Sequence, residues 1–454
     1  MKSGDIMTKS MTEGNPLKLI LNFTIPLLLG NLFQQTYNMV DAMIVGRCIS
    51  ANALASVGAS SSVQFMILGF CMGCCAGFAI PVAQRFGAKD YCKMRSYIFH
   101  AAVLTIAIAI LMTSLCTFFC PEILHLMKTP QNIFKGAYDY LFIIFLGIPF
   151  SLLYNLLAGI LRAVGDSKTP FIFLAISTIL NIILDLIFIL LFHWGCAGAA
   201  AATITAQAVS GLLCLRLVYK KFDILMIQKE ERKIDGKTLQ DCIIMGVPMG
   251  LQYSITAIGS MFLQTSNNNL GAVYISAFAA GSKLKQFAMC PFDALATAVS
   301  NFCSQNLGAC QFNRIRKGLK TGIAIGVIYG AISGIILNLW GYELSTLFVS
   351  ASEVDVLKAS ALYVGHLGLF FWAIGFLNNC RLSIQGIGYA GISIVSGILE
   401  MIARIVVSLA FVPKFGYTAI TFADQCAWLA ACLYCVPLVF ILIKRQEKKC
   451  TTSH

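Results

Sequence analysis

Hydrophobic residues along the chain gather into runs of about 20, separated by short polar segments. A helix of about 20 residues crosses the hydrocarbon core of a bilayer, which is about 30 Å thick. Twelve such runs occur, six on each side of a polar, basic segment at 218–238. The pattern therefore predicts an all-α polytopic membrane protein with twelve transmembrane helices. The predicted spans are roughly 17–41, 52–79, 97–120, 138–160, 170–192, 196–217, 239–265, 272–300, 318–340, 358–380, 389–412 and 418–443.

The two sets of six runs carry matching landmarks. The segment 83–88 (Ala-Gln-Arg-Phe-Gly-Ala) returns 221 residues later as 304–309 (Ser-Gln-Asn-Leu-Gly-Ala). Parallel repeats of this size are typical of transporters built from two related lobes. We therefore predict pseudo-symmetric six-helix lobes at 1–217 and 239–445, a cytoplasmic linker at 218–238 and a cytoplasmic tail at 446–454. Other pairs with nearly the same spacing are Pro26 and Pro248, Gly165 and Gly388, and Gly195 and Gly416.

Composition and charge support a membrane protein and fix its expected orientation. Hydrophobic residues make up 58% of the chain and charged residues 12%, whereas soluble proteins average about 25% charged. If both termini are cytoplasmic, 25 of the 33 Lys and Arg residues fall in cytoplasmic segments and 5 fall outside, as the positive-inside rule requires. Arg162 and Arg381 then anchor span ends at the cytoplasmic face. The basic excess reflects topology, so we expect no nucleic-acid partner.

The sequence lacks the motifs of common enzymes. There is no G-x-x-x-x-G-K-[ST] loop to bind ATP phosphates, and neither H-E-x-x-H nor G-x-S-x-G occurs. Most of the 18 Cys residues lie inside apolar runs, where cysteine behaves as a small hydrophobic residue. The polar N-terminal segment shows no cleavable signal peptide. We therefore expect no catalytic residue and no cofactor.

Two carboxylates in the first half are candidates for chemistry, because a charge within the bilayer is costly. Asp41 follows Gln34, Tyr37 and Asn38 at helical spacing, so these four side chains form one polar stripe. Asp41 could instead cap the helix at the outer surface. Asp185 lies in the middle of its span, one turn after Asn181.

An amide and a carboxylate one turn apart offer oxygen ligands for Na⁺ or a hydrogen-bonded place for a proton. The alternative for Asn181 and Asp185 is an interhelical hydrogen-bond pair without a ligand. Both interpretations place the two side chains on one face of the fifth span.

The second half offers weaker candidates. Glu400 and Arg404 are one turn apart, which predicts a local ion pair. Asp293 shares its span with Lys283 and Lys285, and we expect these charges to neutralise one another. A further intramembrane carboxylate, Asp424, is placed in a substrate cavity of the C-terminal lobe.

Several segments resemble the multidrug and toxic compound extrusion (MATE) family, and the detailed pattern is most similar to its DinF-like bacterial branch. The resemblance runs from about residue 12 to 445. It rests on Leu29-Gly-Asn-Leu-Phe-Gln-Gln-Thr-Tyr-Asn-Met-Val-Asp41, Val45-Gly-Arg47, Ala53-Leu-Ala-Ser-Val-Gly58, Leu161-Arg-Ala-Val-Gly-Asp166, Lys168-Thr-Pro170, Asn181 and Leu184-Asp185.

The resemblance implies a secondary antiporter that exports amphipathic, cationic organic compounds in exchange for Na⁺ or H⁺ by alternating access. It implies a cation site at Asp41, Asn181, Asp185 and Thr203, which would also hold the metal if Na⁺ is the coupling ion. Gln34, Tyr37, Asn38 and Asp424 would then line the substrate cavity. We expect a monomer in the bacterial inner membrane. A lipid-linked oligosaccharide flippase of the same superfamily is the alternative, and a membrane-embedded enzyme is a remote one.

The repeat does not extend to these candidate side chains. When one half is laid over the other, Asp41 faces Phe262 or Leu263, Asn181 faces Arg404, and Asp185 faces Ser408. The acidic chemistry is thus predicted to lie mainly in the first half.

Overall fold

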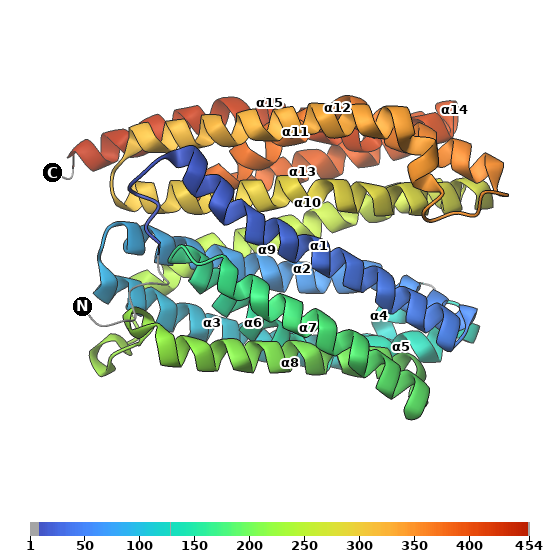
Figure 1. Ribbon diagram of the computed structural model, residues 1–454, viewed down its shortest axis with the longest axis horizontal. Coiled ribbons are helices and arrows are strands. Elements are labelled where there is room, and N and C mark those ends of the chain that lie inside the picture. Colours follow the sequence, from blue (N-terminus) through green and yellow to red (C-terminus); the bar gives the residue numbers. More distant parts are fainter. Residues whose placement is uncertain (1–8, 128, 453–454) are drawn as a thin grey trace. The chain divides into compact units, whose positions relative to one another are not determined.

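A computed structural model describes residues 9–127 and 129–452, which form helices and no strand (Figure 1). The helices up to the linker are α1 Pro16–Cys48, α2 Ala51–Gly87, α3 Tyr91–Phe118, α4 Cys120–Leu126, α5 Gln131–Leu146, α6 Ile148–Ala163, α7 Lys168–Leu186, the π-helix η1 Ile187–Leu191 and α8 Gly195–Lys221. The short 3₁₀ helices η2 Asp223–Leu225 and η3 Lys229–Glu231 follow. The remaining helices are α9 Gly236–Asn268, α10 Ala272–Gly308, α11 Phe312–Ser345, α12 Val354–Gly386, α13 Ala390–Val406, the π-helix η4 Val407–Phe411, α14 Val412–Phe415 and α15 Tyr417–Thr452.

Each of the twelve predicted spans corresponds to a long helix or a helix pair. Among the described residues, ten helices are long and apolar enough to cross a membrane, and α5 with α6 forms an eleventh span bent by 47°. The bend falls at Gly147 and Pro149, because proline lacks the N–H that would continue the helical hydrogen bonds. Helix α10 is as long as its neighbours but more polar, since it carries Lys283, Lys285 and Asp293. With α10 as the remaining span, the prediction of twelve agrees with the structure.

The sequence repeat is also a repeat of backbone geometry. Lys89 and Cys310, 221 residues apart, both have a left-handed φ, of 58° and 53°. The same hydrogen bonds form around them: the amides of Ala88 and Ala309 donate to the carbonyls of Gln84 and Gln305. Gly165 pairs with Gly388 and Gly195 with Gly416, all at positive φ. The π-helices η1 and η4 also lie at related positions, so the two halves are parallel repeats.

The chain divides into two compact units whose boundaries differ from the predicted lobes in two segments. Unit 1 consists of the first ten residues and Leu29–Gly250, and unit 2 of Met11–Leu28 and Leu251–His454. One division lies before α1, between Ser10 and Met11, and the other two fall inside α1 and α9, two residues after Pro26 and Pro248 respectively. The linker belongs to unit 1, and residues 446–452 of the predicted tail continue helix α15.

In unit 1, the first half of α9 packs against α2 through glycines. A Cβ added at Gly246 would overlap the ring of Phe78, and one added at Gly250 would lie 2.7 Å from the carbonyl oxygen of Phe70. Small residues let helix backbones approach closely in membranes, where van der Waals packing drives association. The linker is also held: Arg95 binds Glu231 at 2.6 Å from the start of α3.

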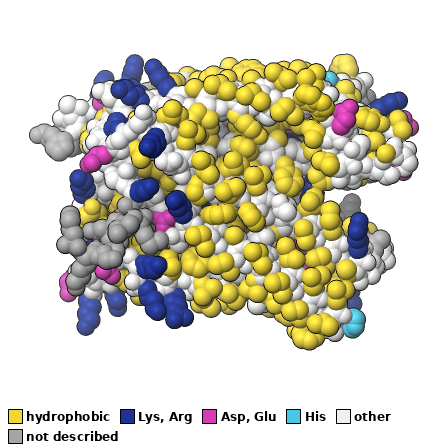
Figure 2. Space-filling model, in the orientation of Figure 1, with side chains coloured by type: hydrophobic (Ala, Val, Ile, Leu, Met, Phe, Trp, Pro, Cys, Tyr) yellow, Lys and Arg dark blue, Asp and Glu magenta, His cyan; other side chains and the backbone are white. Residues whose placement is uncertain are grey.

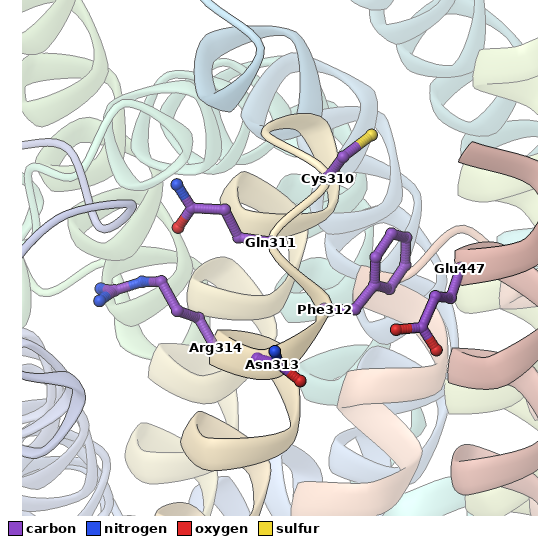
Figure 3. A pocket seen from close by; sticks show the side chains of 6 residues that line it. All are labelled: Cys310, Gln311, Phe312, Asn313, Arg314 and Glu447. Atoms are coloured by element: carbon purple, nitrogen blue, oxygen red, sulfur yellow. The ribbon is translucent and has the colours of Figure 1, made fainter. Parts of the chain in front are cut away.

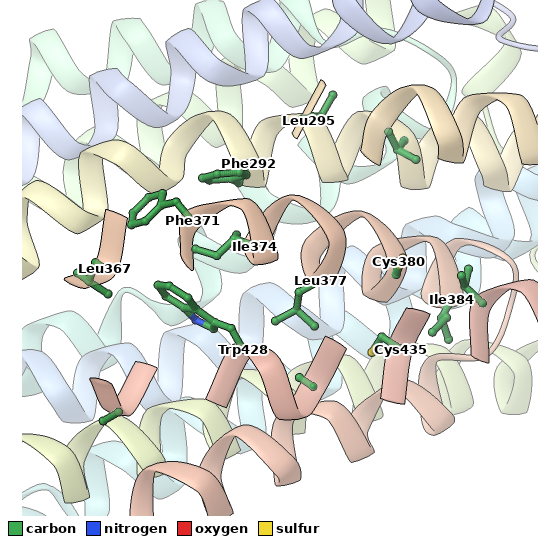
Figure 4. Packing of buried hydrophobic residues seen from close by; sticks show 14 of the residues in the cluster. Phe292, Leu295, Leu367, Phe371, Ile374, Leu377, Cys380, Ile384, Trp428 and Cys435 are labelled. Atoms are coloured by element: carbon green, nitrogen blue, oxygen red, sulfur yellow. The ribbon is translucent and has the colours of Figure 1, made fainter. Parts of the chain in front are cut away.

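In unit 2, one face of α11 carries a glycine every fourth residue and packs against α12. A Cβ at Gly330 would lie 2.7 Å from the carbonyl oxygen of Phe371, and one at Gly326 would lie 2.9 Å from the Cα of Gly375. On its other side α12 forms the apolar core with α10 and α15, where the rings of Phe371 and Trp428 meet edge to face (Figure 4).

The surface of each unit fits a bilayer. Hydrophobic side chains cover the middle of the helices, while Lys and Arg gather mainly at one end (Figure 2). Exposed apolar residues occur in the middle of many helices, for example Ile110, Ile183 and Ile335. In a soluble protein such a continuous apolar surface would cause aggregation, so the multi-pass membrane prediction is confirmed.

Candidate cation site

Four predicted residues from three helices of unit 1 come together. Asp41 lies near the end of α1, Asn181 and Asp185 lie on one face of α7, and Thr203 lies on α8. Helix α8 packs against α7, because η1 and a turn of three residues between the two helices reverse the direction of the chain. All four side chains are buried, and Asp185 has no exposed surface. The π-helix starts two residues after Asp185, a type of helix irregularity that is frequent at functional sites.

Hydrogen bonds link three of the four residues and add Tyr37. The amide of Asn181 reaches the Thr203 hydroxyl at 3.3 Å, and the Tyr37 hydroxyl lies 3.2 Å from the same oxygen. When the side-chain amide of Asn181 is flipped, so that its nitrogen and oxygen exchange places, both atoms have partners. The nitrogen then donates to Asp185 Oδ2 at 3.0 Å, and the oxygen accepts from the Thr203 backbone amide at 3.0 Å. Asn181 thus bonds across helices to Thr203, as the alternative to a cation site predicts, but acceptors of the two carboxyl groups stay unused.

The unused acceptors belong to the two carboxyl groups. Asp41 and Asp185 are within hydrogen-bonding reach of each other. The Oδ1 atom of each is buried without a hydrogen-bond partner. Two adjacent buried carboxylates repel each other and have lost their hydration, so a positive charge must accompany them. A proton can fill this role, or Na⁺ held by the oxygens of Asp41, Asp185, Asn181 and Thr203, which are the hard ligands that such cations prefer.

The residues predicted for the substrate cavity are in different surroundings. Tyr37 lies at the cation site through Thr203, while Gln34 is half-buried and Asn38 is exposed on the same helix. Asp424 lies in unit 2 and is 2% exposed. Its carboxylate accepts from Lys285, Tyr363 and Arg404. The cavity role of these residues stays a prediction, and in the case of Asp424 a substrate would have to compete with three donors.

Sequence reasoning missed a polar residue near Asp41 and its hydrogen-bond partner. Tyr140, on α5, is 4% exposed and close enough to Asp41 to interact electrostatically. Its hydroxyl donates to Gln64 Oε1 on α2 at 3.4 Å. The sequence gives only a weak signal for these two residues: Gln64 is a glutamine inside an apolar run, and Tyr140 is one of 15 tyrosines in the chain.

The ionic partners in unit 2 were only partly predicted. Glu400 and Arg404 form the expected ion pair, at 3.6 Å. The expected neutralisation of Asp293 by its neighbours on α10 was wrong for Lys285, because eight residues of helix separate their Cα atoms by about 12 Å. Lys285 pairs with Asp424 instead, and Asp293 accepts from Asn378.

The prediction that Arg381 ends its span was also wrong. Helix α12 continues to Gly386, which places Arg381 inside the helix. Its side chain is 17% exposed and binds Glu400 at 2.6 Å. The apolar run ended at this residue, but a helix can continue beyond the apolar run when an ion pair compensates the charge.

A surface pocket lies elsewhere, at the turn between α10 and α11 of unit 2. Cys310, Gln311, Phe312, Asn313, Arg314 and Glu447 line it (Figure 3). Arg314 points to one side, where it binds the carbonyl oxygens of Met11 and Gly14. This pocket therefore adjoins a structural clamp on the segment before α1 and has no part in the cation site.

Comparison with known families identifies the chain. The sequence model of the MatE family matches residues 26–187 and 248–410. The two matches begin at Pro26 and Pro248, the first landmarks of the repeat. The chain belongs to the MATE family. It is therefore a membrane transporter and not an enzyme, which removes the remote alternative.

Bacterial relatives cover most of the chain. It is 31% identical to the probable multidrug resistance protein YpnP of Bacillus subtilis over 80% of this chain and 81% of the relative. It is 27% identical to the probable multidrug resistance protein YoeA of Bacillus subtilis over 83% of this chain and 82% of the relative. The multidrug export protein MepA of Staphylococcus saprophyticus is 24% identical over 95% of both chains.

Solved MATE structures share the fold. One, described as an outward-facing conformation of a multidrug resistance MATE family transporter, superposes with a TM-score of 0.90 at 21% identity, over 96% of this chain and 98% of that chain. Another, a MATE transporter in complex with MaL6, gives a TM-score of 0.89 at 21% identity, over the same shares. The fold is thus two related lobes of six helices each.

Proposed function

We propose that this MATE transporter is a secondary antiporter that exports amphipathic, cationic organic compounds in exchange for Na⁺ or H⁺. The observation that carries the proposal is the pair of buried carboxyls, Asp41 and Asp185, with unpartnered oxygens beside Asn181 and Thr203. The names of YpnP, YoeA and MepA support drugs as the exported compounds. We further propose a monomer in the bacterial inner membrane, with both termini cytoplasmic.

Coupling in this proposal depends on helix α1. Asp41 and Tyr37 lie on its second half, and Pro26 interrupts its first half. A proline inside a helix removes a backbone hydrogen bond, so the helix bends there at lower cost. A cation held by Asp41 and the residues of α7 and α8 favours one position of α1. Substrate favours another, and a few kcal/mol of differential affinity for each ligand is enough for alternating access.

The first test replaces the most enclosed carboxyl. Asp185→Asn keeps the shape of the side chain and removes its charge. We expect it to abolish ion-dependent export of ethidium from cells that lack their main efflux pumps, with the protein still present in the membrane. Asp223→Asn, the same substitution at an exposed linker residue, is the matched control and should export normally. Normal export by Asp185→Asn would contradict the proposed site.

The second test identifies the coupling ion. Purified protein in liposomes is given a Na⁺ gradient or a pH gradient, each alone, and ethidium flux is followed. A hydroxyl oxygen can ligate Na⁺ directly, so Thr203→Ala should reduce Na⁺-driven flux about tenfold or more if the ion is Na⁺. If the ion is H⁺, Thr203→Ala should keep most of the flux, because the carboxyls bind the proton. Flux with neither gradient, together with translocation of a lipid-linked pyrophosphate, would favour the flippase instead.

A further inference from the structure

The repeat gives the cation site a counterpart in unit 2 with different side chains. Asn181 corresponds to Arg404, Asp185 to Ser408 and Thr203 to Asp424. The local architecture is similar in both units: a helix and a π-helix are followed by a long helix that packs back on the first, with the short helix α14 inserted before the long one in unit 2. Arg404 precedes η4 on α13, Ser408 lies within η4, and Asp424 lies on α15.

The counterpart has unused hydrogen-bond donors where the cation site has unused acceptors. Arg404 Nη1 is buried and has no hydrogen-bond partner, and the same holds for Ser408 Oγ one turn later. Their side chains point from one face of the helix. Guanidinium nitrogens can only donate, and burying such a donor without an acceptor destabilises the protein. The arrangement therefore lacks an acceptor between Arg404 and Ser408.

The neighbouring carboxylates are already engaged. Arg404 Nε donates to Asp424 Oδ1 at 3.0 Å, and Arg404 Nη2 lies 3.6 Å from Glu400 Oε2. Asp424 Oδ2 also receives bonds from Lys285 at 2.7 Å and Tyr363 at 3.1 Å. Glu400 is shared with Arg381 at 2.6 Å.

The carboxylates of this cluster leave Arg404 partly unpaired. Lys285, Arg381 and Arg404 supply three positive charges, and Glu400 and Asp424 supply two negative ones. A third carboxylate, Asp293, lies at the exposed edge of the cluster, where Asn378 connects it to Arg381. Asp293 offsets the charge of Arg381, so the place that remains for an anion is the unpartnered Nη1 of Arg404.

We propose that unit 2 contains an anion-binding site at Arg404 and Ser408 that takes one small monovalent anion. Two sources share this chemistry: the carboxylate of an organic compound, which the planar guanidinium matches well, and free chloride. The site belongs to unit 2 alone and does not depend on the proposed cation coupling.

The test is equilibrium binding to the purified full chain, with ¹⁴C-benzoate as the probe at constant ionic strength in choline gluconate. We expect saturable binding of one benzoate per chain. Choline chloride is then added as competitor. Displacement at millimolar chloride identifies a site for inorganic anions, and persistence of the bound benzoate identifies a site for organic carboxylates.

Three variants change the site in different ways. Arg404→Gln should weaken anion binding at least tenfold, because it removes the guanidinium donor and its positive charge. Ser408→Ala removes only the hydroxyl and should weaken binding about threefold. Asp424→Asn leaves Arg404 and Lys285 without their shared carboxylate and should strengthen binding. A purely structural ion-pair cluster would not give this opposite sign.

Two outcomes would overturn the proposal: no saturable binding of benzoate or chloride, or unchanged binding in both Ser408→Ala and Arg404→Gln. Because Ser408→Ala is a small change, it keeps the test decisive if Arg404→Gln does not fold. Asp185→Asn should bind benzoate normally while ethidium export is lost, so a failure of the cation site and a failure of the anion site can be told apart.

Discussion

At the scale of single residues, two buried aspartates show how surroundings decide the role of a carboxyl group. Asp185 faces a second carboxyl, an amide and a hydroxyl, and no cation binds it among the described residues. Asp424 receives donors from two cations and a tyrosine. A carboxylate without a protein cation is available to a transported ion, whereas one between two cations is already neutralised. Asp185 is therefore the carboxyl to expect at the coupling step.

Glu231 in the linker gives a prediction on pH. The guanidinium of Arg95 binds both of its carboxylate oxygens, at 2.6–2.9 Å, and this holds the pKa of Glu231 below its usual range. A lowered folded-state pKa means that the stabilisation is present above about pH 4.5 and is lost as the pH falls through the folded-state value. Hydrogen bonds to charged groups of this kind contribute about 1.5–3 kcal/mol.

We therefore expect Glu231→Gln to lower the thermal unfolding midpoint of the purified protein by several degrees at pH 7. The difference from the unmodified protein should shrink at an acid pH, as Glu231 becomes protonated below its lowered folded-state pKa and is then uncharged, like glutamine. Glu230→Gln, at an exposed neighbour, serves as the control and should have no effect at either pH. An equal effect of Glu231→Gln at both pH values would contradict the ion-pair explanation.

The candidate site was more predictable from sequence than its neighbours were. An acidic residue in an apolar run is visible without a structure, and helical spacing joins Asn181 to Asp185. Thr203 came from the family resemblance alone. Tyr140 and its partner Gln64 could not be found, because their hydrogen bond depends on how α2 and α5 pack. The partner of Lys285 was missed for the same reason, since it lies on a distant helix.

At the scale of elements, irregularities in the helices mark the positions that matter. Both π-helices directly follow a buried polar cluster, and the two unit boundaries inside helices each follow a proline. Between these points the helices are held by close backbone contacts at glycines. The number of spans and the repeat could be predicted from the period of apolar runs. The π-helices, the bend between α5 and α6 and the extension of α12 could not, because they depend on packing and ion pairs.

The glycine contact between α9 and α2 can be tested directly. A Cβ at Gly246 would overlap the ring of Phe78, which is itself fully buried. Overpacking of this kind costs about 1–3 kcal/mol, so Gly246→Ala should lower the unfolding midpoint by several degrees. Gly236→Ala, at the start of the same helix with open space around it, is the matched control. If both substitutions had the same effect, the contact would not be what holds the first half of α9.

At the scale of the whole molecule, each unit is completed by a short segment from the other half of the sequence. Residues 11–28 belong with the second half and residues 236–250 with the first. Gln305 Oε1 accepts from the amide of Met11, and Asn306 and Arg314 bind its carbonyl oxygen. The repeated Gln-x-x-Gly-Ala turn therefore clamps the segment before α1 in unit 2.

Expressing the chain as two fragments tests whether each unit needs the segment that comes from the other half of the sequence. Fragments 1–226 and 227–454, expressed separately, each lack a segment that completes a unit, so we expect neither to accumulate in the membrane. Expressed together they should assemble and restore ethidium export. A shorter second fragment that starts at residue 251 should not restore export when it is expressed together with fragment 1–226, because unit 1 then lacks the first half of α9. Full accumulation of either fragment alone would contradict the exchange.

The exchanged segment also has a consequence for the order of assembly during synthesis. Residues 11–28 leave the ribosome long before residues 251–454 have been made. The first half of α1 must therefore stay in the bilayer beside temporary neighbours while eleven further spans are inserted. Any chain that stops early leaves this stretch exposed to membrane proteases. A segment synthesised early is thus among the last to reach its final neighbours, and its protection would report that the transporter has been completed.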